Sequence, residues 1–482
     1  MKPAIPKTEL LQSAQIRKAV FGGSHTLIVA LCCLCFGAGS TPGNSRVSKV
    51  VLKNILSAEQ IEQKMLSMSE AGGGVLVLPK NSTVTATVRS ITYKGWASPH
   101  ALLVPENITL DLNGSSFLLD LRSNSYGVRL ASKSAIRNGT IRLIRSEGAG
   151  AQRIFHAAVS VGAAYGDGGT PDNPSYFSKV VGWRMENLNI DQPFNHSAIQ
   201  LMSEAADGVI TDIRIADSSE APLGIGLDWG TVGPLQMADE KQKEMHELFS
   251  QGKLYGTHPH DILIQKIRIG RLTKNENDDG SAAIRTSACY NITIDEVEIQ
   301  ETGVGIALHA GDAGFEYALQ PHRDIGHAGY VIKNIKVHKA FRKGIIIDGL
   351  SDNIYRAVYN HGDHSLLSPV TPGINKPVIQ NAWLRGDGFT GESGITIYYS
   401  VGARLENIDV AEFHKGIHIG IWTKDITVSR SRIHHNKTGM AMKSPEKKPE
   451  NIVVSQNRFY RNVKDIDKSS LEIKEIDNLH KK

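Results

Sequence analysis

Three residues that can move a proton fall at the same position of three short repeated segments. His309, Asp348 and Tyr398 each end a segment of the form Gly-Ile-x-apolar-x, and the segments read GIALH, GIIID and GITIY. A histidine can act as a base, a carboxylate can orient that base, and a phenol can donate a proton. Arg285 occupies the middle of the comparable segment AIRTS. Its guanidinium could bind a carboxylate through two parallel hydrogen bonds.

These groups suit removal of the proton next to a carboxylate, as at C5 of a uronate sugar. The arginine would neutralise the carboxylate while the histidine takes the proton. Expulsion of the leaving oxygen would then give a lyase, whereas return of a proton from the opposite face would give a C5-epimerase. Asp228 and His418 occupy outward positions of further segments and are expected substrate contacts. The alternative is that these side chains only stabilise a sheet through cross-strand contacts.

A longer repeat must position these residues. The pattern apolar-x-apolar-x-x-apolar-x-apolar occurs nine times, from WRMENLNI at 183 to IVVSQNRF at 452, and its closest copies start 23 to 26 residues apart. Alternation predicts β-strands, and a fixed period of this size predicts a solenoid whose turns pack only on their neighbours. We therefore predict an all-β fold, a right-handed single-stranded parallel β-helix. Strands one turn apart would lie about 4.8 Å apart, so His309, Asp348 and Tyr398 would stack.

Residues ahead of the repeats predict a cap for the solenoid. Ser57 and Gln60 form a capping box, and Ile61, Met65 and Met68 share one face of the helix that follows it. The chain then reads GGGVLVLP from 72 and ENITLDLNG from 106. This run resembles the start of the pectate-lyase-like superfamily of secreted β-helix proteins, and with the repeats the resemblance spans roughly residues 55–463. That superfamily contains lyases, hydrolases, epimerases and phage tailspikes, so the resemblance implies the fold and leaves the reaction open.

The chain is predicted to divide into four parts. Residues 1–40 place two basic residues before an apolar run and end in Ala-Gly-Ser, which predicts a signal peptide too short to anchor the protein stably in a membrane. Residues 41–70 would form a linker and the capping helix, 71–463 the β-helix, and 464–482 a polar tail. After cleavage only Cys289 remains, so we expect no internal disulfide. These features predict a secreted or periplasmic protein.

Four long insertions follow the Gly-Ile segments and complete the predicted site. They cover residues 145–177, 230–259, 311–328 and 349–375. Because stacked coils place equivalent turns along one edge, these loops should wall a cleft beside the His309 segment. Arg356, within the last of them, is a further expected substrate contact.

The segment LYGTHPHD at 254–261 supplies a second set of candidates. It resembles the YGxDPH stretch of the mannuronan C5-epimerases at four positions, Tyr255, Gly256, Pro259 and His260. The resemblance implies His260 as an alternative base and Tyr255 as an alternative proton donor. His258 stands where that family has Asp, which leaves Asp261 to orient the base, and both residues are expected substrate contacts. The other interpretation is a turn that contains histidines and enters the next strand.

Charge and composition limit the partners. The formal charge of +5 falls to about +2 without the signal segment, which holds four basic residues and one acidic residue. No basic tract is present, so we expect no nucleic-acid partner. We expect no metal site and no cofactor, although NENDDG at 275–280 leaves calcium open as an alternative. The predicted partner is an anionic polysaccharide, and we expect the protein to be a monomer.

Two other functions remain open besides a lyase or C5-epimerase. A glycoside hydrolase of the same fold would need paired carboxylates, and Asp228 and Asp348 would lie about 14 Å apart by strand spacing, beyond the usual ~6.5–9.5 Å for inversion. A non-catalytic, tailspike-like protein would instead bind glycans through surface aromatic residues. Candidates for that role are Trp229, Tyr399 and Trp422.

Overall fold

All described strands belong to one continuous sheet. The fold is taken from a computed structural model of the chain. The described residues are 48–121, 125–145, 156–163, 176–191, 197–228, 259–273, 281–287, 289–310, 329–349, 374–442, 449–467 and 473–481. The pairings in the sheet are parallel, except between β4 (Arg89–Tyr93) and β5 (Trp96–Val104). Each strand pairs with the strands one turn before and after it, as in the series β14, β16 and β18, so the sheet winds into a coil.

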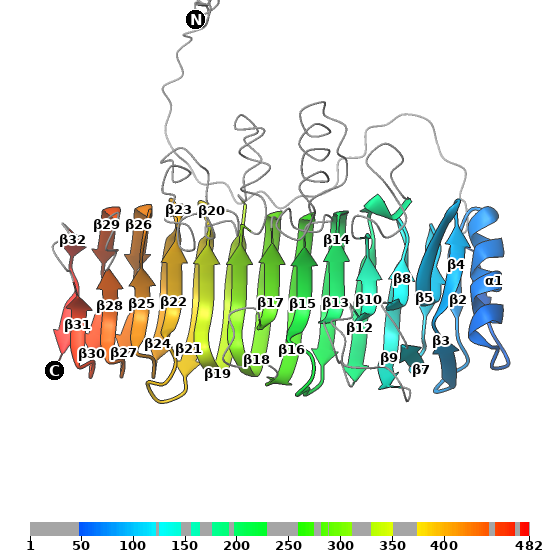
Figure 1. The fold of residues 1–482 in the computed structure, drawn as a ribbon, viewed down its shortest axis with the longest axis horizontal. Helices are drawn as coiled ribbons and strands as arrows, with labels where there is room; N and C mark the ends of the chain where they lie inside the picture. The colour runs from blue at the N-terminus through cyan, green and yellow to red at the C-terminus, as the bar shows by residue number, and fades with distance from the viewer. Residues whose placement is uncertain are drawn as a thin grey trace, which may run out of the picture. The chain divides into compact units, whose positions relative to one another are not determined.

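Each turn carries three main strand segments, which form three faces, and successive turns stack along the long axis (Figure 1). The Gly-Ile segments form the C face, which consists of β5, β8 (Ser125–Leu130), β10 (His156–Val161), β13 (Ser197–Met202), β15 (Leu223–Asp228), β17 (Ala282–Ser287), the ends of β18 (Tyr290–His309) and β19 (Val331–Asp348), β22 (Ser393–Tyr398), β25 (Lys415–Ile419), β28 (Thr438–Met442) and β31 (Lys464–Asp467). The strands predicted for these segments are therefore confirmed.

The longer repeat forms the other two faces, its first half the A face and its second half the B face. The A face begins with β1 (Lys49–Val51), β2 (Gly74–Val77) and β6 (Ile108–Asp111), and the B face begins with β3 (Thr83–Thr87) and β7 (Ser116–Leu121). Strands that run through both are β9 (Ala135–Arg145), β12 (Arg184–Asp191), β14 (Glu204–Ile215), β16 (His260–Leu272), β18, β19, β21 (Val378–Gly386) and β24 (Arg404–Ala411). The A face ends with β26 (Lys424–Ser429), β29 (Glu450–Ser455) and β32 (Ile473–Ile476), and the B face ends with β27 (Arg432–His434), β30 (Arg458–Tyr460) and β33 (Leu479–Lys481).

A shorter series of strands lies between the C and A faces. It contains β11 (Lys179–Val181), which follows the 3-10 turn η1 (Tyr176–Ser178), and farther along β20 (Ile374–Asn375) and β23 (Ser400–Val401). β11 pairs with the first residues of β14. The start of β14 pairs with the start of β16, which pairs with the start of β18. This edge therefore carries the residues at which each new repeat begins.

The corner between the A and B faces depends on single residues with positive φ. Asn334, Asn381 and Asn407 have φ of 56°, 54° and 54° at this corner. Asparagine tolerates the left-handed region better than most residues with a side chain. The amides also pair along the stack: Asn381 donates to Asn334 at 3.0 Å, and Asn407 donates to Asn381 at 2.8 Å. The Asn of the repeat therefore both turns the chain and joins neighbouring coils.

The glycines that open the C-face segments are required by packing. A Cβ on Gly394 would lie 2.0 Å from Cγ2 of Val410, inside the coil. The two inward residues that follow it, Ile395 and Ile397, are fully buried. The alternation after the glycine therefore directs the first and third of the next residues into the core and leaves the second and fourth facing outward.

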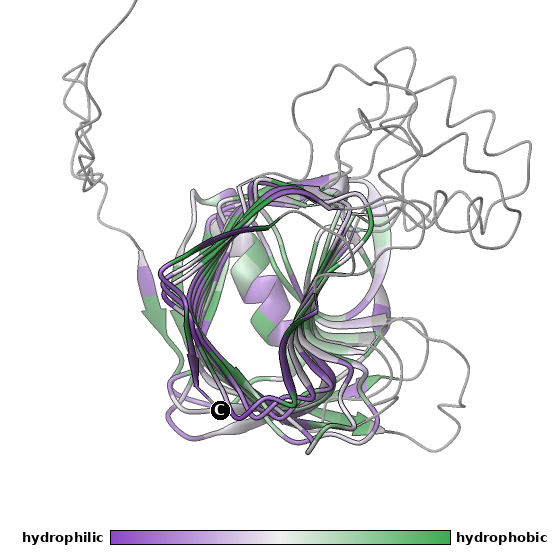
Figure 2. Cartoon of the chain, turned by 90° about the vertical axis from the view of Figure 1, so that its left-hand side faces the viewer, coloured by the Kyte–Doolittle hydropathy of each residue, from purple (hydrophilic) through white to green (hydrophobic). Residues whose placement is uncertain are grey.

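The helix α1 (Ala58–Glu70) covers the N-terminal end of the stack, as predicted. Ser57 accepts a hydrogen bond from the backbone of Gln60, whose side chain accepts one from the backbone of Ser57, which confirms the capping box. Ile61 and Met65 are 1% and 0% exposed. Seen along the stack, α1 lies across the interior that the superposed coils enclose (Figure 2). It is the only α-helix among the described residues, and it is too short and too polar to span a membrane.

Two parts of the fold differ from the expected pattern. The strands β4 and β5 form an antiparallel hairpin around Lys94 and Gly95, both with positive φ, which no repeat indicated. At the other end, β31, β32 and β33 add strands to all three faces within residues 464–482, where the sequence suggested only a polar tail. Ile466 and Ile473 pack on the main core and explain why this polar segment joins the ladder.

Candidate functional site

The strand register brings the predicted proton-moving residues together on the C face. His309 lies opposite Asp348, and Asp348 lies opposite Tyr398, on consecutive strands. On the other side, Ser287 lies opposite His309. Neighbouring parallel strands are about 4.8 Å apart, so each side chain starts within reach of the next. The predicted stacking is confirmed, and we call these four residues the His309 row.

Arg285 belongs to a parallel row, two residues closer to the start of each strand. This Arg285 row consists, in register order, of Gly226, Arg285, Ala307, Ile346, Thr396 and His418. Arg285 is therefore one coil from His309 and diagonally offset, as predicted. Its Nη2 lies 3.5 Å from Oδ2 of Asp228, and about a quarter of its side chain is exposed. A carboxylate ligand could exchange for Asp228 at this guanidinium.

His309 is neutral at neutral pH. Burial away from solvent is the main reason that the pKa of its imidazole is lowered to about 3, and the positive charges of Arg285 and Lys343 add to the shift. Part of the residue is still accessible to solvent. A neutral imidazole has a free lone pair, and an anionic ligand beside it would favour the protonated form and raise the pKa. The site therefore holds a weak base whose strength would increase when a negatively charged substrate binds.

Tyr398 contacts His418, a member of the Arg285 row on the next strand. Its hydroxyl lies 3.1 Å from Nδ1 of His418, and the two rings meet edge to face with centroids 5.4 Å apart. His418 is 9% exposed. On the next strand, Gly420 follows Ile419, the partner of Ile397, and a Cβ at Gly420 would lie only 2.2 Å from Cε1 of Tyr398. The glycine therefore leaves the space that the phenol ring occupies.

His260 forms a separate cluster at the edge between the C and A faces. Its Nδ1 lies 2.6 Å from Oδ2 of Asp261, so the expected contact is present. Its ring stacks on Tyr290 with centroids 4.6 Å apart, and its Nε2 is 3.7 Å from Oε1 of Glu204. The nearby Glu204 carboxylate is the largest cause of a raised pKa of His260, and Asp261 adds to it. Unlike His309, His260 is therefore biased toward the protonated form.

Three residues of these clusters were not predicted from the sequence. Glu204 contacts His260 and also forms a 2.6 Å ion pair with Lys179 of the adjacent strand. Lys343 is 4% exposed, and its positive charge helps to lower the pKa of His309. Its Nζ lies 2.9 Å from Oε2 of Glu392. Neither pair lies within the longer repeat. Tyr290 could have been found, because aligning ILIQKIRI with ITIDEVEI places it one coil from His260.

Several sequence candidates lie outside the described residues. These are Tyr255, His258, Arg356, Trp229, most of the four insertions and the calcium alternative at 275–280. Among the hydrogen bonds and ion pairs of the described residues, none joins His260 to the His309 row. In the same part of the chain, no three His, Cys, Asp or Glu side chains are grouped so that they could hold a metal ion.

One of the three aromatic residues considered for a binding protein is buried, whereas Trp422 is partly exposed. Tyr399 is 3% exposed and packs with Ile421 and Trp422 in a small apolar cluster. Its φ of 47° places it at a corner of the coil. Its ring is therefore withdrawn from the surface, and Tyr399 cannot serve as an exposed glycan platform.

Comparisons with known proteins agree with the fold. A family model described as a right handed beta helix region matches residues 325–473. The chain folds as a right-handed parallel β-helix. No curated protein matches its sequence.

Solved structures of similar fold have different activities. One is the A-module of mannuronan C-5 epimerase AlgE4 from Azotobacter vinelandii, with 10% identity, a TM-score of 0.38, and 87% of this chain and 94% of that chain covered. Another is the catalytic domain of a GH87 alpha-1,3-glucanase in complex with nigerose, with 11% identity, a TM-score of 0.46, and 92% and 70% covered. A third is a tailspike protein of E. coli bacteriophage HK620 in complex with a pentasaccharide, with 9% identity, a TM-score of 0.45, and 88% and 75% covered. Similarity at this level says nothing about the activity of this chain.

Proposed function

We propose that this chain is a secreted or periplasmic enzyme that removes the C5 proton of a uronate residue in an acidic polysaccharide. It would act as a polysaccharide lyase or as a C5-epimerase. The observation that supports this best is the register that stacks His309, Asp348 and Tyr398 on consecutive strands. Arg285 lies one coil away, where its guanidinium can bind the carboxylate of the same sugar.

The roles follow from the electrostatics of the site. Arg285 binds the uronate carboxylate and lowers the cost of the negative charge that develops when the C5–H bond breaks. His309 takes that proton on its neutral imidazole, and Asp348 orients the ring and stabilises its positive charge. Tyr398 donates a proton to the leaving oxygen as the C4–O bond breaks, or to C5 from the opposite face. The first outcome leaves a C4=C5 double bond, and the second inverts C5.

His260 is the alternative base, and the two histidines differ in charge. Glu204 and Asp261 raise the pKa of His260, so it holds its proton at higher pH than His309 does. A base must begin without its proton, which favours His309 for the abstraction step. The raised pKa suits His260 to hold an anionic group by hydrogen bonding. The variants His309→Ala and His260→Ala therefore test two different roles.

The test uses the full chain and a panel of uronate polymers. A lyase reaction produces an unsaturated uronate, which is followed by its ultraviolet absorbance. We expect His309→Ala to abolish turnover, Tyr398→Phe to lower kcat, and Arg285→Gln to raise KM as well as lower kcat. Thr396→Ala, between Ile346 and His418 in the Arg285 row, is the matched control and should retain activity. An unchanged rate in His309→Ala would show that the base lies elsewhere.

A further inference from the structure

A second row of charged side chains runs along the B face. It consists, in register order, of Arg214, Arg268, Glu298, Lys336, Trp383, Asp409, Arg432 and Arg458. We call it the Trp383 row, and it lies on a different face from the His309 row. Five of its members are basic and exposed, whereas two are acidic. At ~4.8 Å per strand, eight residues extend over roughly 34 Å.

The row has an aromatic centre surrounded by cations. Cζ of Arg385 lies 4.1 Å from the ring centroid of Trp383, and Nζ of Lys336 lies 5.5 Å from it. The ring of His338 meets the indole edge to face at 5.4 Å. Trp383 keeps part of its surface accessible, and about half of the Lys336 side chain is exposed. Cation–π contacts therefore hold positive groups beside an accessible indole.

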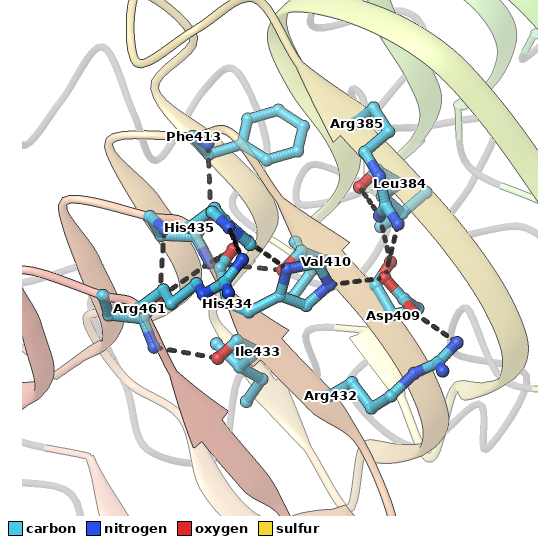
Figure 3. Close-up of polar contacts among 12 residues, drawn as sticks. Leu384, Arg385, Asp409, Val410, Phe413, Arg432, Ile433, His434, His435 and Arg461 are labelled. Atoms are coloured by element: carbon cyan, nitrogen blue, oxygen red, sulfur yellow. Dashed lines mark hydrogen bonds and ion pairs between the residues drawn. The ribbon is translucent and has the colours of Figure 1, made fainter. Parts of the chain in front are cut away.

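Asp409 binds both Arg385 and Arg432 (Figure 3). Its Oδ1 lies 2.7 Å from Nη2 of Arg385 and 3.0 Å from Nε2 of His434, and its Oδ2 lies 2.5 Å from Nη2 of Arg432. Asp409 is 8% exposed, whereas 59% of the Arg432 side chain is exposed. One buried carboxylate thus anchors two arginines, and Arg432 still presents much of its guanidinium to solvent.

The histidine of this cluster is also fixed. His434 is 9% exposed and stacks on Tyr460 with centroids 4.5 Å apart and planes 7° apart. Its Nδ1 lies 2.7 Å from Nδ1 of His435, whose Nε2 is 3.4 Å from Nη1 of Arg461. Arg461 can only donate, so its contact makes His435 accept at Nε2 and donate from Nδ1. His434 then accepts at Nδ1 and donates from Nε2 to Asp409, so each of these contacts has one donor and one acceptor.

We propose that the Trp383 row is a second binding surface for an anionic polysaccharide, separate from the His309 row. A linear polyuronate repeats its carboxylates along one axis, and the row places five cations along one axis at multiples of the strand spacing, with Glu298, Trp383 and Asp409 between them. The accessible indole would contact the apolar face of a sugar ring. A neutral glycan would gain nothing from five exposed cations, and a single central indole provides little stacking for nucleic-acid bases. The choice of a uronate polymer rests on the proposed function.

The test measures binding in a protein that cannot turn over. The background is the full chain with His309→Ala and Arg285→Gln, so that the C-face site contributes as little as possible to binding. Mobility is measured by native electrophoresis in gels that contain alginate, polygalacturonate or neutral dextran, at low and high salt. The test variant adds Arg432→Gln with Arg458→Gln, and a second variant adds Trp383→Ala alone. The matched control adds Arg404→Gln with Lys424→Gln, two exposed cations of the A face.

We expect the B-face pair to weaken binding of an acidic polymer about tenfold at low salt, whereas the A-face pair changes it by about twofold or less. Trp383→Ala should weaken binding at both salt concentrations, because stacking is not screened. Equal mobility of the two paired variants would overturn the proposal. Retardation of the background by neutral dextran but by neither uronate polymer would also overturn it. Loss of turnover in the enzyme assay has no bearing on this result, so the two proposals fail separately.

Discussion

At the scale of single residues, Gly420 determines where the proposed proton donor lies. A Cβ at this position would come within 2.2 Å of Cε1 of Tyr398. We expect Gly420→Ala to displace the phenol ring from His418 and to lower kcat about tenfold or more, because a small shift of a catalytic group is costly. Steady-state kinetics on the responsive polymer measure the effect, with the melting temperature as the control for folding. Full activity in Gly420→Ala would rule out Tyr398 as the donor.

A second residue-scale prediction concerns the pH dependence of activity. Desolvation and the charge of Arg285 lower the pKa of His309, which must be neutral to act as a base. Removing the positive charge in Arg285→Gln raises that pKa, so the variant loses the neutral form at a higher pH than the wild type. The acid limb of the kcat/KM profile should therefore move to higher pH, in addition to the fall in kcat/KM. An acid limb that stays in place or moves to lower pH would show that the charge of Arg285 does not lower the pKa of the catalytic base.

At the scale of strands, Asp409 joins three coils of the B face. Burial opposes its charge, but the hydrogen bond from His434 and the charge of Arg385 outweigh burial and lower the pKa of Asp409 to about 2. Asp409→Asn leaves two arginines and a histidine without their anion, and we expect it to lower the free energy of unfolding by about 2–3 kcal/mol. Glu406→Gln breaks a more exposed ion pair, that of Glu406 with Arg430, and should lower the free energy of unfolding by less than about 1 kcal/mol.

The pH dependence of this loss has a definite sign. Because the folded-state pKa of Asp409 is depressed, its stabilisation is complete above the ordinary pKa of 3.8 and is lost as pH falls to about 2. Denaturation midpoints of the wild type and Asp409→Asn should therefore differ at pH 7 and converge near pH 2. A difference that is constant with pH would mean that the carboxylate charge is not what stabilises these strands.

The repeat explains which contacts the sequence could predict. Residues at equivalent positions of neighbouring coils are aligned by the pattern alone, so the stacking of His309, Asp348 and Tyr398 followed from it. The same alignment of the B face would have shown Trp383 opposite Asp409. Contacts between the edge strands, such as Glu204 with His260, were not predicted, because these short segments vary in length and carry no repeat. The hairpin of β4 and β5 was missed because its strands pair with each other and interrupt the coil.

At the scale of the whole molecule, a stack of coils is stable only if its ends are covered. Ile61 and Met65 of α1 close the N-terminal end with 1% and 0% exposure. We expect Ile61→Asp to uncover the first coil and to yield aggregated protein, because it places a charge in a buried apolar site. Gln63→Asp, on the exposed side of the same helix, should remain soluble. Size-exclusion chromatography distinguishes them, and a soluble, monodisperse Ile61→Asp protein would show that α1 is not a necessary cap.

The central claim, that the His309 row removes the C5 proton of a uronate, is tested most directly by proton NMR in deuterium oxide. The wild type and His309→Ala are each incubated with uronate polymers, and the C5 proton signal is followed. We predict that the wild type either replaces this proton with deuterium and inverts C5 or produces unsaturated chain ends, and that His309→Ala does neither. Intact C5 signals with every polymer, or equal exchange by both proteins, would contradict the account.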